Sequence, residues 1–558
     1  MTRDIASAAA LVILAVVAAQ AAPIPLDLPP GAQEAARVID RATLEGPTRF
    51  LADDLLEGRG AGQHGDVLAR NYVASVMELL GLQPAGPAGG WEQRFDIVGI
   101  TTHAPETWTF RAGGRELALR FWDEFIAAAG VQAPEVSVAD AELVFVGYGI
   151  HAPEYNWDDF KGADLKGKML VVMNDDPDWD PALFAGKRRL YYGRWMYKYE
   201  NAARAGATGA IIIHTTPSAG YGWQVVQNSW TGEQVELPDE GEQRVKVRAW
   251  TTEDAMRRLL ALAGFDLDAL VSKARSRDFR PVPLGIRTSL DLANTLRRGE
   301  TANVLGMIPG SDPKLKEQVV VFTAHHDHLG IGKPDAKGDV IYNGARDNAT
   351  GVAQVLSIAK AFTALPQRPR RTLLFAIVTL EESGLLGSAY YVAHPTFPIE
   401  RIVADINFDG ANIFGKTHDV ELVGKGMSTL DQVVEAATAL QGRVVTDESH
   451  PDRGSYYRSD HFSFAKVGVP TLYFSSGLDF VGREPGWGKK VTEEWNNAHY
   501  HQPSDEFSPG WNFDGMVEDA QLGFLAGLAV AQADAVPSWL PGAEFGSLRQ
   551  AAPAPQPR

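Results

Sequence analysis

Apolar runs alternate with amphipathic runs through the second half of the chain, and this pattern limits the possible folds more than any other feature. The strand-like runs are residues 302–310, 318–324, 371–380, 401–409 and 471–476, and the helix-like runs are residues 349–364, a segment near 388, 428–441 and 515–534. Apolar strands that alternate with amphipathic helices are typical of α/β proteins. We therefore predict a largely parallel (mixed) central sheet with helices on both faces.

The first half of the chain has a different character. At 558 residues the chain exceeds what one hydrophobic core usually organises. Short β-rich runs such as ELVFVGYGI and GAIIIHTT indicate a separate unit at residues 140–285, which we call the insert. We predict a core domain in two parts, residues 22–139 and 286–540, and a disordered Pro-rich tail at residues 541–558. His151 and His214 are not expected to bind metal, and no chemistry is expected in the insert.

The amino-terminal residues have the form of an export signal. Arg3 precedes the apolar run AAALVILAVVAA, and Ala19-Gln20-Ala21 has the small-x-small form of a signal-peptidase site. We predict a signal peptide at residues 1–21, cleavage near Ala21 and an exported protein, periplasmic or extracellular. An uncleaved anchor is the alternative. No later segment reaches about 18 consecutive apolar residues, so no membrane span is expected in the mature chain.

Composition excludes several function classes. The formal net charge of -18 argues against nucleic acid and anionic lipid surfaces as partners, because phosphate binding needs clustered Lys and Arg. It suits peptide or amine ligands. The chain has no cysteine, which excludes disulfides, cysteine-type zinc sites and thiol nucleophiles. The sequence makes no prediction of oligomeric state.

Metal-binding residue types recur at the ends of the predicted strands. They are His325, Glu381-Glu382 and Asp409, joined by Asp347 in a Gly-rich turn and His501 after the last strand. Charged residues are rarely buried unless they are paired or bind metal, so their convergence on one sheet edge predicts a metal site. A solvated His-rich turn is the alternative for residues 325–328. Imidazole with carboxylate is typical of zinc, and Mn²⁺ or Co²⁺ would tolerate the same set. Two imidazoles and three carboxylates fit two metals if one carboxylate bridges.

Six motifs in this order resemble one family. HHDHLG, GARDNATG, EESGLLGS, NFDG, SDHFSFAKVGVP and YHQPSDEF are similar to motifs of the M28-type co-catalytic di-zinc metallopeptidases, the aminopeptidase and glutamate-carboxypeptidase-like family. The insert resembles a protease-associated (PA) domain. The resemblance implies a phosphorylase/hydrolase-like zinc-exopeptidase core, two Zn²⁺ ions, and peptide substrates with a free amino terminus.

The resemblance also implies roles for individual residues. It implies that His325, Asp347, Glu382, Asp409 and His501 bind metal, with Asp347 as the bridge. It implies that Glu381 is the general base and that Asp327 orients His325. Tyr500 occupies the place from which some members direct a phenol at the oxyanion, and packing is the alternative. We expect the neighbouring histidines to lie at the rim of the site: His326, His328, His450 and His499.

The favoured function is an exported aminopeptidase that uses a hydroxide between two zinc ions, with Glu381 as base. A carboxypeptidase or dipeptidase would need a cationic subsite, which Arg453 and Arg458 could supply. A glutaminyl-cyclase-like transferase needs only one metal and is less favoured. A receptor-like ectodomain without metal is least favoured, because such a protein need not retain all five ligands and the base.

Overall fold

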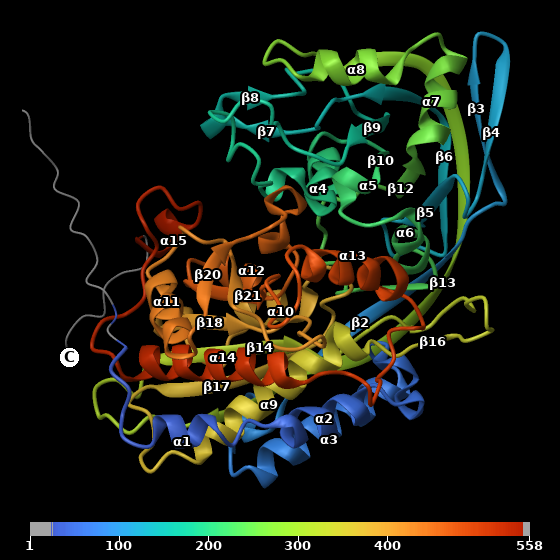
Figure 1. The fold of residues 1–558 in the computed structure, drawn as a ribbon. Coiled ribbons are helices and arrows are strands. Elements are labelled where there is room, and N and C mark those ends of the chain that lie inside the picture. The colour runs from blue at the N-terminus through green and yellow to red at the C-terminus, as the bar shows by residue number, and fades with distance from the viewer. Residues whose placement is uncertain (1–23, 25, 551–558) are drawn as a thin grey trace, which may run out of the picture.

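The computed structural model describes residue 24 and residues 26–550 of the chain (Figure 1). The predicted signal peptide at residues 1–21 therefore lies outside the described residues. Within the described part, no helix combines the length and the apolar character that a membrane crossing requires.

Four parallel strands form the centre of the sheet in the carboxyl-terminal half of the chain. In spatial order they are β17 (Thr372–Val378), β14 (Val319–His325), β18 (Ile402–Asn407) and β21 (Thr471–Ser476). β13 (Val282–Ile308) pairs antiparallel with β17, β19 (Asp419–Val423) pairs antiparallel with β21, and β20 (Val444–Asp447) runs parallel to β19. The predicted α/β fold with a mixed central sheet is confirmed.

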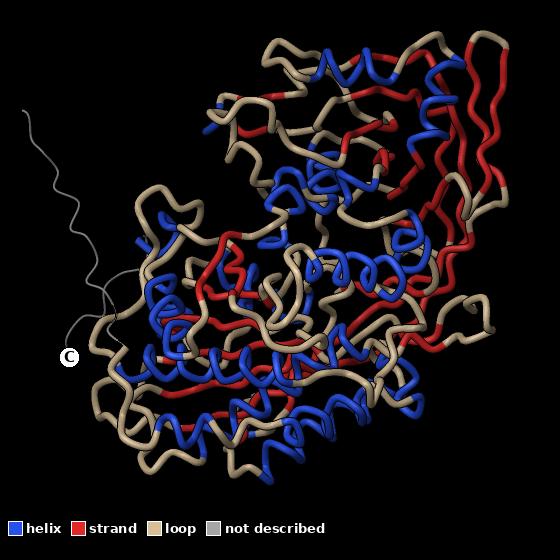
Figure 2. The backbone as a smooth tube through the Cα atoms, in the orientation of Figure 1, coloured by secondary structure: helices blue, strands red, loops and turns tan. Residues whose placement is uncertain are grey.

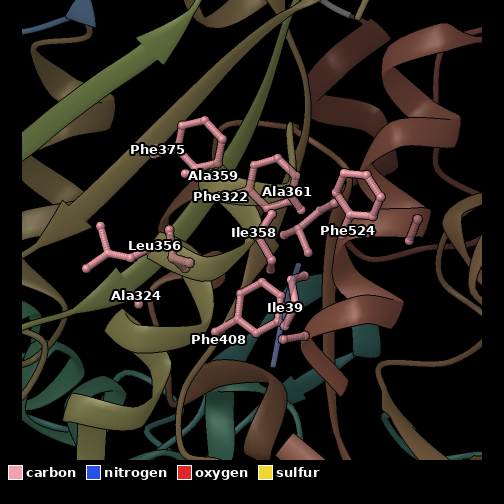
Figure 3. Close-up of a cluster of buried hydrophobic side chains, with 14 of the residues drawn as sticks. Ile39, Phe322, Ala324, Leu356, Ile358, Ala359, Ala361, Phe375, Phe408 and Phe524 are labelled. Carbon is pink, nitrogen blue, oxygen red and sulfur yellow. The ribbon is translucent and has the colours of Figure 1, made fainter. Parts of the chain in front are cut away.

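Alternate residues of β14 point to opposite faces of this sheet, as the two-residue period of a strand requires. Phe322 and Ala324 join the cluster in Figure 3, and Val319 and Val321 join the cluster on the other face. The first face is covered by α1 (Ala32–Ala36), α2 (Arg41–Leu51), α3 (His64–Leu79), α9 (Thr350–Thr363), α11 (Leu430–Leu440) and α14 (Asp514–Gln532), and the second by α10 (Leu386–Ala393) and α12 (His461–Ala465). Because both faces are covered, the central strands are predominantly apolar, with Asp405 and Asn407 of β18 as buried exceptions.

A second hydrophobic core lies in the upper part of Figure 1. Its strands are β3 (Thr107–Ala112), β4 (Arg115–Arg120), β5 (Phe125–Ala129), β6 (Glu135–Phe145), β9 (Met169–Met173), β10 (Gly209–His214) and β12 (Val247–Thr252), and its helices include α4 (Trp195–Arg204), α7 (Glu253–Leu262) and α8 (Leu267–Ala274). A neighbouring cluster of buried side chains includes Val226 of α6 (Trp223–Ser229). The buried residues of this core extend from Val98 to Leu292. The core therefore uses more of the chain than residues 140–285, and the predicted domain boundaries stay a prediction.

One long strand connects the two cores. β13 has 27 residues and pairs with β6 in the second core and with β17 in the central sheet (Figure 2). Along its middle it pairs antiparallel with β2 (Glu92–His103), in a register that runs from Ala293 opposite His103 to Val304 opposite Glu92. The two cores thus share a continuous ladder of main-chain hydrogen bonds.

The carboxyl-terminal segment is only partly as predicted. Residues 541–550 are folded: they include α15 (Gly546–Gln550), and Phe545 is buried against Tyr456. The Arg549 guanidinium donates to the Ile402 carbonyl. A buried aromatic residue anchors this stretch despite its Pro- and Gly-rich composition, so the prediction of disorder is wrong for residues 541–550. Residues 551–558 lie outside the described part.

Candidate metal centre

Three neighbouring parallel strands bring the predicted ligands to one edge of the sheet. His325 is the last residue of β14, Glu381 and Glu382 follow β17, and Asp409 follows β18. The register aligns His325 with Val378 and Thr323 with Asn407, so the three strands end at the same level. The carboxyl edge of an open α/β sheet is where ligands bind.

Asp347 lies in a tight turn just before α9, and buried hydrogen bonds fix that turn. The Asp505 carboxylate accepts from the main-chain N–H groups of Arg346 and Asp347 at 2.9 and 3.0 Å. The Asn348 side chain donates to the Phe408 carbonyl and accepts from the Gly410 N–H, at 2.9 Å each. The turn is therefore tied directly to the loop that carries Asp409.

The two carboxylate oxygens of Asp347 face two different imidazoles. Oδ1 lies 3.3 Å from Nε2 of His325, and Oδ2 lies 3.3 Å from Nε2 of His501. Each imidazole also faces a further carboxylate: Asp409 Oδ1 lies 3.4 Å from His325 Nε2, and Glu382 Oε2 lies 3.2 Å from His501 Nε2. The structure thus brings all five predicted ligands together, in two halves that share Asp347.

These distances suit divalent metal. Two ligand atoms on a tetrahedral zinc ion, each about 2.0–2.1 Å from the metal, lie about 3.3 Å from one another. His501 Nε2 and Glu382 Oε1 are buried and have no hydrogen-bond partner among the described residues. Several sets of three donor atoms, among them the set from His325, Asp347 and Asp409, lie within 4.8 Å of one another. Buried nitrogen and oxygen atoms that have no hydrogen-bond partner, and that lie as far apart as two ligands of one metal ion, are expected at a metal site.

The charges of the site are strongly coupled. Burial alone would raise the pKa of Asp347, but its contacts with His325 and His501 outweigh burial and hold that pKa well below its usual value. Burial alone would lower the pKa of His325, but Glu381 and Asp409 raise it well above its usual value. Burial raises the pKa of Glu382 to about 8. Such a concentration of opposed shifts is typical of a functional site.

Glu381 stands beside this set of donors. Its Oε2 is 4.0 Å from His325 Nε2, farther than the oxygens of Asp347 and Asp409. Its main-chain N–H donates to Asp327 Oδ1 at 3.2 Å. Burial, together with the nearby carboxylates of Asp409 and Glu382, raises the pKa of Glu381 well above its usual value.

Asp327 is close to His325, as the resemblance implies. His325 Nδ1 lies 3.2 Å from the Asp327 carbonyl oxygen and 3.7 Å from its carboxylate Oδ1. The main-chain carbonyl is therefore the nearer partner of the ring. Both residues are buried, which holds the imidazole in one orientation.

The prediction that His326 and His328 lie at the rim is wrong. Both rings are buried, because Asp66 of α3 lies against His326 and Glu382 lies against His328. His326 Nε2 lies 2.9 Å from Asp66 Oδ1, and His328 Nδ1 lies 2.6 Å from Glu382 Oε1 without hydrogen-bond alignment. Burial lowers the pKa of His328 to about 4, so this ring is neutral at physiological pH. His328 with Asp347 and Glu382 forms a further set of possible ligands.

Two cavities meet at the centre. The larger, of about 310 Å³, is lined by Asp347, Glu381 and Asp409 on one side and by residues of the insert, including Tyr221, on the other. The smaller, of about 120 Å³, is lined by Glu382 and His501. Among the residues shared by both walls are Glu381, Tyr221, Val225, Arg458 and Tyr500. Substrate groups on both sides of a scissile bond therefore have space beside the metal ligands.

Tyr500 lies within reach of this space. Its hydroxyl is 3.5 Å from an Arg458 guanidinium nitrogen, and its ring lies against that of His501, with centroids 4.0 Å apart and the planes tilted by 33°. Burial raises the pKa of Tyr500 well above its usual value, so the phenol stays protonated and can donate a hydrogen bond.

Sequence reasoning missed the buried Arg59. Its guanidinium donates to the main-chain carbonyls of His326, Asn343 and Gly344, and so joins the His325 loop to the turn before Asp347. An arginine among the glycines of LEGRGAGQHG was the available signal. The pattern does not say which carbonyls such a residue contacts.

Comparisons with known proteins agree with this geometry. The model of the Peptidase family M28 matches residues 303–524. The leupeptin-inactivating enzyme 1 of Streptomyces exfoliatus is 28% identical over 210 residues, covering 37% of this chain and 43% of the relative. The probable leucine aminopeptidase 2 of Aspergillus oryzae is 28% identical over 218 residues, covering 37% and 40%. The chain thus spans less than half the length of these curated relatives.

One solved structure shares the fold over most of both chains. The aminopeptidase from Aneurinibacillus sp. strain AM-1 aligns with a TM-score of 0.53 at 20% identity, covering 90% of this chain and 97% of that one. At this identity the likeness concerns the fold alone. The ligand set and the matched segment coincide, since all five predicted ligands lie within residues 303–524. Residues 303–524 of this chain therefore match the model of Peptidase family M28, and they hold all five predicted ligands.

Proposed function

We propose that this chain is an exported, zinc-dependent aminopeptidase that hydrolyses the first peptide bond of substrates with a free amino terminus. The observation that carries the proposal is the carboxylate of Asp347, whose two oxygens lie 3.3 Å from two different imidazoles. A carboxylate in that position suits a bridge between two zinc ions. Bound zinc would lower the pKa of a coordinated water and polarise the substrate carbonyl.

The protein groups have complementary tasks. Glu381 faces the cavity, and its raised pKa suits a carboxylate that takes a proton from water and passes it to the leaving amine. The Tyr500 phenol is a hydrogen-bond donor for the oxygen of the tetrahedral intermediate. The larger cavity also contains Glu421, Glu448 and Glu493, carboxylates that suit a substrate ammonium group. The name of one relative, the probable leucine aminopeptidase 2, supports an aminopeptidase in particular.

A dipeptidase or carboxypeptidase is the second candidate, and two arginines favour it. Arg453 and Arg458 both line the larger cavity, and no carboxylate of the described residues lies within 4.0 Å of either guanidinium. An unpaired guanidinium in a substrate cavity can bind a substrate carboxylate in a bidentate manner. Export rests on residues 1–21 alone.

A substrate panel tests both candidates. Purified protein, reloaded with zinc after dialysis, would be given leucine anilide, N-acetyl-leucine anilide, a dipeptide, its amide, and an N-blocked dipeptide. We expect cleavage of the anilide and of both unblocked peptides, with no cleavage of the N-acetylated substrate. Cleavage of the N-blocked dipeptide would favour the second candidate, particularly if Arg458→Gln reduces it. No hydrolysis of any substrate by the zinc-loaded protein would refute both.

A further inference from the structure

His501 is held from both sides, and one side belongs to the insert. Its Nε2 faces Asp347 and Glu382, whereas its Nδ1 lies 2.6 Å from the hydroxyl of Ser229. The preceding residue of the insert takes part as well: the Asn228 side chain donates to the His501 carbonyl at 3.0 Å. Both residues end α6, more than 270 positions away in sequence.

The chemistry of imidazole gives the Ser229 contact a definite consequence. A neutral histidine carries one proton, and a ring nitrogen that binds metal must be the unprotonated one. If Nε2 is the ligand, Nδ1 carries the proton and donates to the Ser229 hydroxyl oxygen. That bond fixes both the tautomer and the orientation of the ring.

The backbone of His501 also needs this support. Its φ is 55°, in the left-handed region that a β-carbon disfavours. Such a conformation persists only where surrounding contacts hold it. The Asn228 bond to the His501 carbonyl and the Ser229 bond to its ring supply such contacts from outside the peptidase unit.

α6 is itself firmly attached, through Trp122, which precedes the insert in the chain, and through a cluster of buried side chains. The Trp223 and Gln227 side chains both donate to the Trp122 carbonyl, at 2.8 and 2.9 Å. Val226 is fully buried in a cluster of the insert that includes Trp250. Ser229 is therefore presented to His501 by a rigid element.

We propose that Ser229 is a positioning residue for the metal ligand His501, so that the insert completes one half of the metal centre. The inference rests on the proposed zinc-dependent function. It assigns the insert a part in metal binding, where the sequence indicated no chemistry.

The test is a chelator titration of the full-length, zinc-loaded chain that follows each bound zinc ion separately. Ser229→Ala should lower the affinity for one of the two zinc ions about 10- to 100-fold, the usual effect of losing such an orienting group. The affinity for the other zinc ion should not change. Ser229→Thr keeps the hydroxyl and should restore binding. Thr231→Ala is the matched control, because among the described residues that hydroxyl bonds only to the Gln227 carbonyl of the same segment.

The outcomes separate this inference from the proposed function. Wild-type protein that binds no zinc would refute the metal-dependent function itself. Wild-type protein that binds two zinc ions, with Ser229→Ala binding both equally well, would overturn only the role of Ser229. Equal weakening in Thr231→Ala would also overturn it, because the effect would then be a general loss of insert structure. Thermal unfolding of the metal-free variants should match that of wild type.

Discussion

Glu381 and Glu382 are identical in chemistry and adjacent in sequence, yet they face different partners. Glu382 Oε2 lies 3.2 Å from His501 Nε2, whereas Glu381 makes its closest imidazole approach, 4.0 Å, to His325. Both residues lie in the turn that follows β17, and this turn directs their side chains to different imidazoles. We propose that Glu382 is the ligand and Glu381 the base.

Two isosteric substitutions test this division. Glu381→Gln should keep both zinc ions and the fold but lose activity by about 10²- to 10⁴-fold, the usual range for a general base. Glu382→Gln should lose occupancy of one zinc ion, with partial rescue of activity by excess zinc, because an anionic ligand becomes neutral. Metal content and turnover are measured in parallel. Loss of metal in Glu381→Gln with full occupancy in Glu382→Gln would reverse the two roles.

Residues at strand ends could be predicted from the sequence, because an apolar run that stops at a histidine or a carboxylate is visible in one segment. His326 and His328 could not be placed. Their burial depends on Asp66 and Glu382, which approach from elsewhere in the chain. Ser229 was invisible for the same reason, since a single serine in the insert carries no pattern.

At the scale of elements, α3 helps to fix the loop that follows β14. Asp66 on α3 is fully buried and accepts from the Gly62 N–H, the Thr301 hydroxyl and Arg70, in addition to contacting His326. Helix and strand existence could be predicted from apolar periodicity. These cross-element contacts could not, because spacing within one segment does not specify its partners.

Removal of the Asp66 carboxylate should destabilise the protein. Asp66→Ala leaves buried donors without an acceptor and breaks a buried ion pair. Such a change typically lowers the free energy of unfolding by about 3–5 kcal/mol. Asp40→Ala is the control, because Asp40 caps α2 at the surface and its loss should cost about 1 kcal/mol. Thermal unfolding at pH 7 measures both. Equal effects of the two substitutions would contradict the importance of the buried network.

This contribution also has a definite pH dependence. Burial would raise the pKa of Asp66, but His326 and Arg70 outweigh burial and lower it below its usual value. The folded-state pKa is thus below the unfolded-state value of about 3.9. The stabilisation is present above that value and is lost as pH falls through the folded-state pKa. The difference in thermal midpoint between wild type and Asp66→Ala should therefore shrink when both are measured near pH 3.

At the scale of the whole molecule, the second core determines which excisions the chain can tolerate. Replacing residues 140–285 by a linker removes β9 and β12, the partners of β6 and β5, and exposes Trp108 and Phe125. We expect that variant to aggregate. A two-residue turn between His103 and Ala293, which are paired residues of β2 and β13, keeps their ladder.

The His103–Ala293 variant should be soluble. Its affinity for one zinc ion should be lower than that of wild type, because Ser229 is absent. Soluble yield, circular dichroism and chelator titration of the two variants provide the measurement. A soluble, well-folded 140–285 deletion would show that the second core does not need the strands it shares. The sequence pattern predicts two units but places the edge of the insert at a change of composition. The buried residues of the second core extend further, from Val98 to Leu292.

The bond between Ser229 and His501 links zinc binding at this centre to the docking of α6, two equilibria that would otherwise be independent. Whatever factor the docking of α6 contributes to zinc affinity, zinc must contribute to the docking of α6, because coupling free energies are reciprocal. A metal ion at this centre would then help to hold the two units together, although none of the five predicted ligands belongs to the insert. Scarcity of zinc would then weaken the docking of α6 against His501 as well as stop the proposed catalysis.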